Sequence, residues 1–175
     1  MNSENTVVNT KRLSIAKACL DDAPFIFELL NTPSWIEYIG DRGIKTVQDA
    51  ERYIQDALID SYQKNGFGLY KVLNSEESKP IGLCGLLQRE FLQVPDLGFA
   101  ILPEYAGKGY MKEAAQAVLK YETNKHNLKE VQAITSPINS RSRGLLKVLD
   151  FSMLKAIWPD GNEEELVLYS YKHNK

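Results

Sequence analysis

The sequence predicts an α+β fold in which one mostly antiparallel, twisted sheet of about seven strands carries helices on both faces. Apolar runs of strand length and segments of helical spacing follow one another in the order β-α-α-β-β-β-α-β-α-β-β. Such a mixed order is typical of an antiparallel sheet covered by helices. The 175 residues, 43% of them hydrophobic, are enough for one domain with a sizeable core. With no repeat or linker in view, residues 1–175 are expected to form that single domain.

The N-terminal third is predicted to hold one strand and three helical segments. The polar residues 1–9 are expected to be flexible. Thr46 and Asp49 resemble a capping box with Asp in place of Glu, so a helix is expected to begin there. The expected elements are a strand over 12–18, a helix from Asp21 or Asp22 to Leu30, a short helical turn over 34–39, and a helix carrying Val47, Ala50, Ile54, Ala57 and Leu58 on its apolar face.

The middle of the chain is predicted to form three consecutive strands, and the C-terminal part alternates helices and strands. Gly82 and Gly85 inside one strand indicate a bulge or the close approach of another backbone. Asp160-Gly161 is a turn signal between the last two strands. The expected strands are 67–73, 81–87, 94–102, 131–135, 151–158 and 166–171, and the expected helices are 110–126 and a segment from Asn139 or Ser140 to Asp150.

A glycine pair at a strand-to-helix turn is the first functional signal. Gly107 and Gly109 lie between a buried strand and a helix, where the first backbone N–H groups lack partners and carry partial positive charge. Without Cβ atoms, these residues let an anion approach the backbone, and Lys108 adds a cation. The pattern indicates a site for a pyrophosphate, although an ordinary left-handed turn before a helix would look the same. It is neither a P-loop nor a dinucleotide fingerprint, because the further glycines and the Ser or Thr are missing.

Composition excludes several classes of function. Twenty-one Lys and Arg against 23 Asp and Glu give a net charge of −2, which does not favour nucleic-acid binding. No apolar run is long enough for a membrane span, and the N-terminus is unlike a signal peptide, so a cytoplasmic protein is expected. Two cysteines and two histidines do not suggest a metal site or a Ser-His-Asp triad, and both cysteines are expected to be buried.

Taken together, three separated segments resemble the GCN5-related N-acetyltransferase (GNAT) superfamily, and most of all its branch of ribosomal-protein alanine and serine N-acetyltransferases. The resemblance extends from Thr10 to about Tyr171. Its segments are Asp96 to Ala114 with the glycine turn, Asn139-Ser140-Arg141-Ser142 with the following Leu145, Leu146, Leu149 and Phe151, and Ile81 to Gly85. The sequence departs from the family pattern at Ala106, Met111 and Asp150, and has no glutamate base at Ile134.

The resemblance implies a V-shaped cleft between the strands 94–102 and 131–135, in which acetyl-CoA is the co-substrate and no metal is needed. It implies that the pantetheine arm pairs with the backbone of Ile101 and Leu102. It also implies that the pyrophosphate lies on the turn and that Asn139 and Ser142 face the cofactor. The turn residues are Ala106, Gly107, Lys108, Gly109, Tyr110 and Met111. From the residues alone, Asn139 or Ser140 is equally well interpreted as a helix cap.

The reaction implied is attack of a neutral amine on the acetyl thioester. It needs a proton acceptor, a donor for the thioester oxygen, and a proton for the leaving thiolate. Ser142 is the candidate proton donor by family analogy. Asp96 is the leading candidate base because it begins the strand that lines the cleft, and Glu90 is an alternative; both could instead be surface carboxylates.

The acceptor is expected to be a protein N-terminal amine. A small amine such as a polyamine, amino acid or aminoglycoside is the main alternative, and a non-catalytic acyl-CoA-binding domain is a further one. The run Glu163-Glu164-Glu165 is either a solvated surface or an attractive patch for a cationic amine, in which case Trp158 and Pro159 are expected to form an apolar wall beside it. The sequence leaves a homodimer open.

Overall fold

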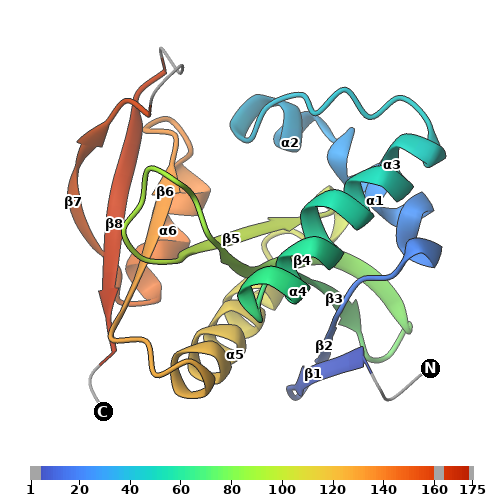
Figure 1. Ribbon diagram of the computed structural model, residues 1–175, viewed down its shortest axis with the longest axis horizontal. Coiled ribbons are helices and arrows are strands. Elements are labelled where there is room, and N and C mark those ends of the chain that lie inside the picture. The colour runs from blue at the N-terminus through green and yellow to red at the C-terminus, as the bar shows by residue number, and fades with distance from the viewer. Residues whose placement is uncertain (1–4, 160–163, 174–175) are drawn as a thin grey trace.

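The computed structural model describes residues 5–159 and 164–173, and its centre is one eight-stranded sheet with the order β1-β2-β3-β4-β5-β6-β8-β7. All neighbouring strands are antiparallel except β5 and β6, which are parallel. The predicted mixed, mostly antiparallel α+β fold is therefore confirmed (Figure 1). The strands are β1 (Thr6–Asn9), β2 (Leu13–Ala16), β3 (Leu69–Asn74), β4 (Lys79–Leu87), β5 (Asp96–Ile101), β6 (Glu130–Thr135), β7 (Ser152–Ile157) and β8 (Leu166–Lys172).

The strand that the sequence analysis missed is β1. Residues Thr6–Asn9 were expected to be flexible, but they pair antiparallel with β2 and bring the sheet to eight strands. β1 is four residues long and its side chains are exposed or half-buried, so its sequence lacks a clear apolar alternation. Its pairing partner, β2, has the buried side chains of Leu13 and Ile15 and was predicted.

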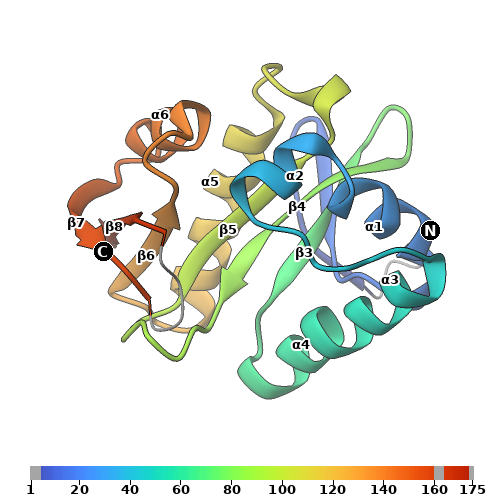
Figure 2. The same cartoon turned by 90° about the horizontal axis from the view of Figure 1, so that it is seen from above.

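Helices cover both faces of the sheet, as predicted. Adjacent residues of β3 show this, because successive strand side chains point to opposite faces. Tyr70 donates its hydroxyl hydrogen to buried Glu122 of α5 at 2.5 Å, and Lys71 pairs with Asp22, just before α1, at 2.8 Å. Figures 1 and 2 show α5 on one side of the strands and the run α1–α4 on the other. The helices are α1 (Ala23–Leu30), α2 (Pro33–Tyr38), α3 (Val47–Tyr53), α4 (Asp60–Asn65), α5 (Tyr110–Lys125) and α6 (Ser140–Val148), with 3₁₀ turns at Leu20–Asp22 and Pro103–Tyr105 and a π-helical segment, Ile54–Ile59, joining α3 to α4.

Local sequence signals explain where several helices begin and end. The Thr46–Asp49 capping box is present in both directions at the start of α3. Asp150 has φ +63°, and the N–H of Phe151 bonds to the carbonyl oxygen of Leu146 at 3.0 Å, so α6 ends in a left-handed residue as expected. Met111 at the start of α5 is 8% exposed, and its side chain packs toward Gly82 of β4.

β5 and β6 form only one registered pair, Asp96 with Gln132, and then separate. One further bond, from the N–H of Gln132 to the carbonyl oxygen of Pro95 at 2.9 Å, closes this end. Figure 1 shows the consequence: β6, β8 and β7 stand apart from the β1–β5 part of the sheet. The predicted separation of these two strands is thus observed, and it exposes the facing backbone edges of both.

Gly82 and Gly85 of β4 lie where another backbone passes very close, as their positions in the sequence predicted. A Cβ atom on Gly82 would lie 2.4 Å from the carbonyl oxygen of Ala100, and one on Gly85 would lie 1.9 Å from that of Gly68. The register of β4 against β3 also shifts by one residue between Gly82 and Pro80, so a bulge is present as well. These glycines let three strands pack tightly immediately behind the β5 edge.

In residues 5–159 and 164–173, no helix is long and apolar enough to cross a bilayer.

Gly85→Ala should destabilise the protein, because the added methyl group would overlap backbone that cannot rotate away. A cost of about 1–3 kcal/mol in the free energy of unfolding is typical of such overpacking. Gly144→Ala is the matched control: a Cβ there meets no atom within 4 Å, and alanine favours the helix by about 1 kcal/mol. Urea titration of both variants measures the difference. A Gly85→Ala protein as stable as the wild type would contradict the packing described for β4.

Candidate active site

The turn between β5 and α5 has a backbone that few residues other than glycine adopt. Gly107 and Gly109 have φ values of +76° and +78°, and Gly109 is the residue that precedes the first residue of α5. L-residues with a Cβ pay a steric cost in this left-handed region. The two glycines therefore set the path of the chain, and both are exposed at the surface.

This path leaves a row of backbone N–H groups pointing out of the turn. Within the described chain, the N–H groups of residues 107–112 donate no hydrogen bond, and the first bonded N–H of α5 is that of Glu113, to the carbonyl oxygen of Gly109 at 3.2 Å. The N–H of Ala106 already bonds to Pro103 at 3.1 Å. The donors available to an anion therefore begin at Gly107 rather than at Ala106 and extend to Lys112, which the sequence analysis did not include. Free N–H groups at a helix start attract phosphate.

The backbone of β5 presents a second set of groups to the gap between β5 and β6. The N–H of Leu102 bonds to the carbonyl oxygen of Ile81 at 2.9 Å, so these two residues form a hydrogen-bonded pair of the antiparallel β4–β5 ladder. In an antiparallel ladder the bonding alternates, so the backbone of Phe99 and Ile101 faces away from β4 and toward β6. Of the two residues implied to pair with pantetheine, Ile101 has the required orientation, whereas Leu102 uses both backbone groups within the fold, its carbonyl oxygen accepting from Tyr105 at 3.0 Å.

Asn139 and Ser142 lie at the start of α6, beyond the C-terminal end of β6. The side-chain oxygen of Asn139 accepts the N–H of Ser142 at 3.0 Å, so Asn139 is the N-cap of the helix. Ser142 is half-buried, and its hydroxyl has no hydrogen-bond partner among the described residues. The capping interpretation of Asn139 is confirmed, and the role of either residue toward a cofactor stays a prediction.

Asp96 is a buried carboxylate at the closed end of the gap. Its side chain is 1% exposed, and the Nε–H group of Arg89 donates to its two oxygens at 3.1 and 3.0 Å. Burial raises the pKa of Asp96, and the charge and hydrogen bond of Arg89 act in the opposite direction without cancelling the rise. Asp96 is therefore not a surface carboxylate. Glu90, the alternative base, is exposed to solvent.

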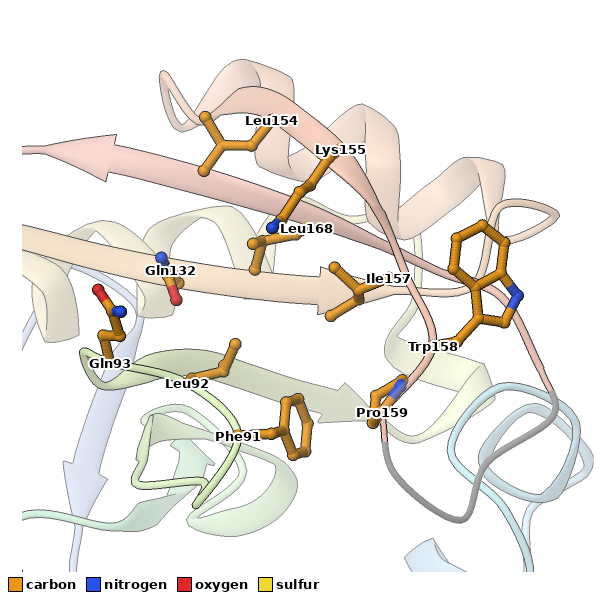
Figure 3. A pocket seen from close by; sticks show the side chains of 10 residues that line it. All are labelled: Phe91, Leu92, Gln93, Gln132, Leu154, Lys155, Ile157, Trp158, Pro159 and Leu168. Atoms are coloured by element: carbon orange, nitrogen blue, oxygen red, sulfur yellow. The ribbon is translucent and has the colours of Figure 1, made fainter.

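A cavity of about 420 Å³ lies between the segment preceding β5 and the outer strands β7 and β8 (Figure 3). Gln132 lines it and is the register partner of Asp96, so both side chains belong to the same face of the sheet. The opposite face carries α6, because Arg143 of that helix donates to the hydroxyl of Tyr169 at 3.1 Å. The lining residues are Phe91, Leu92, Gln93, Gln132, Leu154, Lys155, Ile157, Trp158, Pro159 and Leu168.

The cavity wall combines seven apolar side chains with the polar groups of Gln93, Gln132 and Lys155. Trp158 and Phe91 are 59% and 44% exposed, which is unusual for large aromatic side chains on a domain surface. The Oε1 atom of Gln132 is buried and accepts no hydrogen bond within the described chain. Lys155 also extends into this space in Figure 3. Across the described residues, no group of three or more His, Cys, Asp and Glu side chains gathers to hold a metal ion.

Comparison with known proteins decides the family. The family model described as an acetyltransferase (GNAT) domain matches residues 12–152, which is most of the chain. The chain belongs to the GNAT acetyltransferase family. A relative named as an uncharacterized N-acetyltransferase, YnaD of Bacillus subtilis, is 28% identical over 159 residues, covering 89% of this chain and 90% of the relative. The protein is therefore an N-acetyltransferase, and GNAT enzymes use acetyl-CoA.

Solved GNAT structures share the whole fold at low sequence identity. The ribosomal-protein-S5-alanine acetyltransferase of Vibrio fischeri has a TM-score of 0.78 at 19% identity, over 96% of this chain and 97% of that one. RimL, a ribosomal L7/L12 alpha-N-protein acetyltransferase in complex with coenzyme A, has a TM-score of 0.82 at 13% identity, over 95% and 97%. At these identities the likeness concerns the fold.

The aromatic cavity was only partly predicted from the sequence. Trp158 and Pro159 were expected to form an apolar wall, and they line the cavity. The contribution of Phe91, Leu92 and Gln132 was missed, because they are distant in sequence from Trp158 and only the sheet register brings them together. Of the acidic run, Glu163 lies outside the described residues, as does the turn at Asp160-Gly161, and Glu164 and Glu165 are exposed.

Gly109→Asp should weaken CoA binding at least tenfold, because a carboxylate would stand where a phosphate is expected and would compete for the neighbouring guanidinium of Arg12, 3.4 Å from the Cβ position. Gly43→Asp is the control for backbone strain, since Gly43 also has a positive φ, +67°, in open space away from the turn. Isothermal titration calorimetry with CoA measures both variants. Equal CoA affinity in the two folded variants would remove this turn from the binding site.

Proposed function

We propose that this N-acetyltransferase binds acetyl-CoA along the turn and the free edge of β5, and transfers the acetyl group to a protein N-terminal amine held in the aromatic cavity. The single observation that carries the proposal is the early separation of β5 from β6. The turn precedes α5, which covers one face of the sheet, and the cavity lies on the other. Two substrates entering from opposite faces would meet in the gap without displacing one another.

The cofactor part of the proposal rests on unpaired donors. The oxygens of the pyrophosphate would accept hydrogen bonds from the N–H groups of residues 107–112. The start of α5 adds a partial positive charge, which favours an anion there. The amide-rich pantetheine arm would continue the ladder on the outer edge of β5, at Phe99 and Ile101. A strand-like arm explains why a sheet edge inside the molecule is left without a protein partner.

The transfer itself forms a C–N bond and breaks the C–S bond of the thioester. A backbone N–H of β5 would stabilise the charge that develops on the thioester oxygen. The amine would lose a proton to Asp96, directly or through water, and Asp96 would pass it on to solvent. The departing thiolate would receive the hydroxyl proton of Ser142, and Ser142 would take up a proton from a solvent water in the same step, so that no alkoxide is left. Ser142 suits this role because its hydroxyl is half-buried and has no partner in the described chain.

The position of Asp96 and its ion pair with Arg89 support a role for Asp96 as the base. It lies on the same face as the cavity, next to Gln132, and its pKa is raised by burial. A carboxylate with a raised pKa is a stronger base than an exposed one, and a neighbouring arginine favours its ionised form. Arg89 therefore favours the form of Asp96 that can accept a proton.

The acceptor part of the proposal rests on the chemistry of the cavity wall. Among the described lining residues there is no carboxylate and there is one cation, Lys155, which disfavours a polyamine carrying several positive charges. A peptide brings one amine, apolar side chains for Phe91 and Trp158, and backbone N–H groups that could satisfy the buried Oε1 atom of Gln132. RimL and the Vibrio fischeri enzyme, which are both named for ribosomal-protein substrates, support the same acceptor class.

Arg89→Gln should move the acidic limb of the pH profile of kcat/KM to higher pH. A base must be deprotonated to act, and removing the nearby cation raises the pKa of Asp96 further, so activity should be lost at a higher pH as the solution is acidified. Arg52→Gln is the control, because Arg52 pairs with Asp49 at the exposed surface of α3. A profile unchanged by Arg89→Gln would exclude Asp96 as the base.

Trp158→Ala should raise the KM for a peptide acceptor by about tenfold, the loss expected when an aromatic side chain that anchors a partner is truncated. Its effect on the KM for acetyl-CoA should be small. Val148→Ala, which truncates another exposed apolar side chain at the end of α6, should change neither value. The measurement is the rate of CoA release with three acceptors. They are a short peptide with a free N-terminus, a form of that peptide whose N-terminus is blocked and which contains a lysine, and spermidine. A preference for spermidine would refute the acceptor class while leaving the acetyl transfer in place.

A further inference from the structure

The connection between β1 and β2 contacts the turn between β5 and α5, which carries the proposed phosphate site, although the two segments are about a hundred residues apart in sequence. Arg12, the residue before β2, donates from its Nη1 atom to the carbonyl oxygen of Lys108 at 3.0 Å. Its guanidinium also lies over the ring of Tyr110, the first residue of α5, at 4.5 Å from the ring centre. Arg12 therefore touches the turn on both sides of Gly109.

Glu113 in the first turn of α5 holds Arg12 in this position. Its Oε2 atom accepts from Nε of Arg12 at 2.7 Å, and its Oε1 atom accepts from the backbone N–H of Arg12 at 2.9 Å and from the hydroxyl of Thr10 at 2.6 Å. Partial burial raises the pKa of Glu113, and the hydrogen bonds from Thr10 and Arg12 more than offset this, so the pKa is lowered. A carboxylate with three donors on it is a rigid anchor for the guanidinium.

One nitrogen of Arg12 is left for a ligand. Nε is used by Glu113 and Nη1 by Lys108, whereas Nη2 donates no hydrogen bond within residues 5–159 and 164–173. Nη2 lies 3.4 Å from the place where a Cβ of Gly109 would be, so it stands beside the free N–H groups of the turn. The lysine of the turn is engaged elsewhere, since Nζ of Lys108 lies over the ring of Tyr105, 5.4 Å from its centre.

We propose that Arg12 binds the pyrophosphate of acetyl-CoA through Nη2 and, through its bond to Lys108, holds the turn in the shape that presents its N–H groups. This inference rests on the proposed cofactor site at the turn. A guanidinium fits the task because its three nitrogens can donate separately to Glu113, the turn and a phosphate oxygen, whereas the donors of an ammonium group all come from a single nitrogen. Charge, geometry and the open edge at Gly109 all favour an anion at this point.

The site is selective for one part of the cofactor, and this makes the proposal testable without knowing the acceptor. CoA carries a pyrophosphate and a separate 3′-phosphate, and dephospho-CoA keeps the pyrophosphate alone. Arg12→Ala should weaken the binding of both ligands by the same factor, about tenfold or more, as expected for the loss of a hydrogen bond between charged groups. Arg12→Lys should lose less than Arg12→Ala, because it keeps the charge but not the fork.

Lys11→Ala is the matched control. Lys11 is the neighbouring cation, is exposed, and makes no interaction with the turn in the described structure, so its removal changes the net charge equally and should leave both affinities unchanged. Calorimetry should be repeated at two salt concentrations. The affinity of Arg12→Ala should depend less on salt than that of the wild type, since one phosphate contact is lost. Damage to the hairpin alone would not produce this change in salt dependence.

Each outcome bears on a different claim. Equal wild-type and Arg12→Ala affinities would overturn the inference, and so would a loss confined to CoA with dephospho-CoA unaffected, which would assign Arg12 to the 3′-phosphate. If circular dichroism shows that Arg12→Ala does not fold, the test is made with Arg12→Lys. An Arg12→Lys protein that binds both ligands with wild-type affinity at both salt concentrations would overturn the inference. A wild-type protein that binds neither ligand would instead refute the cofactor site itself, and with it the role of Arg12.

Discussion

The single registered pair between β5 and β6 is the constraint on which the rest of this structure depends. A parallel ladder that continued past Asp96 and Gln132 would close the sheet and occupy the backbone groups of both strands. Because the strands separate, the fold has an internal edge that its own chain does not use. Different segments lie on the two faces of the sheet at that edge. One face is covered by α5 and α6, and the other carries the segment that contains Phe91 and Leu92.

Unpaired backbone groups are costly when they are buried, and this fold places them where a ligand can reach them. The free N–H groups at the start of α5 and the outer edge of β5 are both next to the gap. At Gly82 and Gly85, β4 lies close against β5 and against the start of β3, so the β5 edge is backed by closely packed backbone. Preorganised donors of this kind bind anions and developing charge with little rearrangement.

The hairpin formed by β1 and β2 contacts the start of α5 through the residues that join its two strands. Arg12 and Thr10 meet Glu113 of α5, and Asn74 at the end of β3 donates to the hydroxyl of Tyr110 at 3.2 Å. The turn between β5 and α5 is thus supported by residues next to β2 and at the end of β3, rather than by its own sequence neighbours alone. β1 itself places the partly buried side chains of Val7 and Val8 against the core, and the contacts with the turn and with α5 come from Thr10 and Arg12, which follow it.

The sequence by itself determined the order of the strands from β2 onward, the family, and the glycine turn, because these follow from local rules. Helix caps such as Thr46 with Asp49, the left-handed end at Asp150, and the positive φ values of Gly107 and Gly109 each depend on residues within a few positions of one another. Alternation along β5 could also have separated Ile101 from Leu102, had the pairing with Ile81 been known. The tertiary structure alone decided which distant residues complete the site. Arg12 reaches the turn, and Phe91 and Gln132 join Trp158 in one cavity, through strand register and chain crossing. Such contacts leave no periodic signal in a single sequence, because a side chain's partner across the sheet is set by packing rather than by its spacing along the chain.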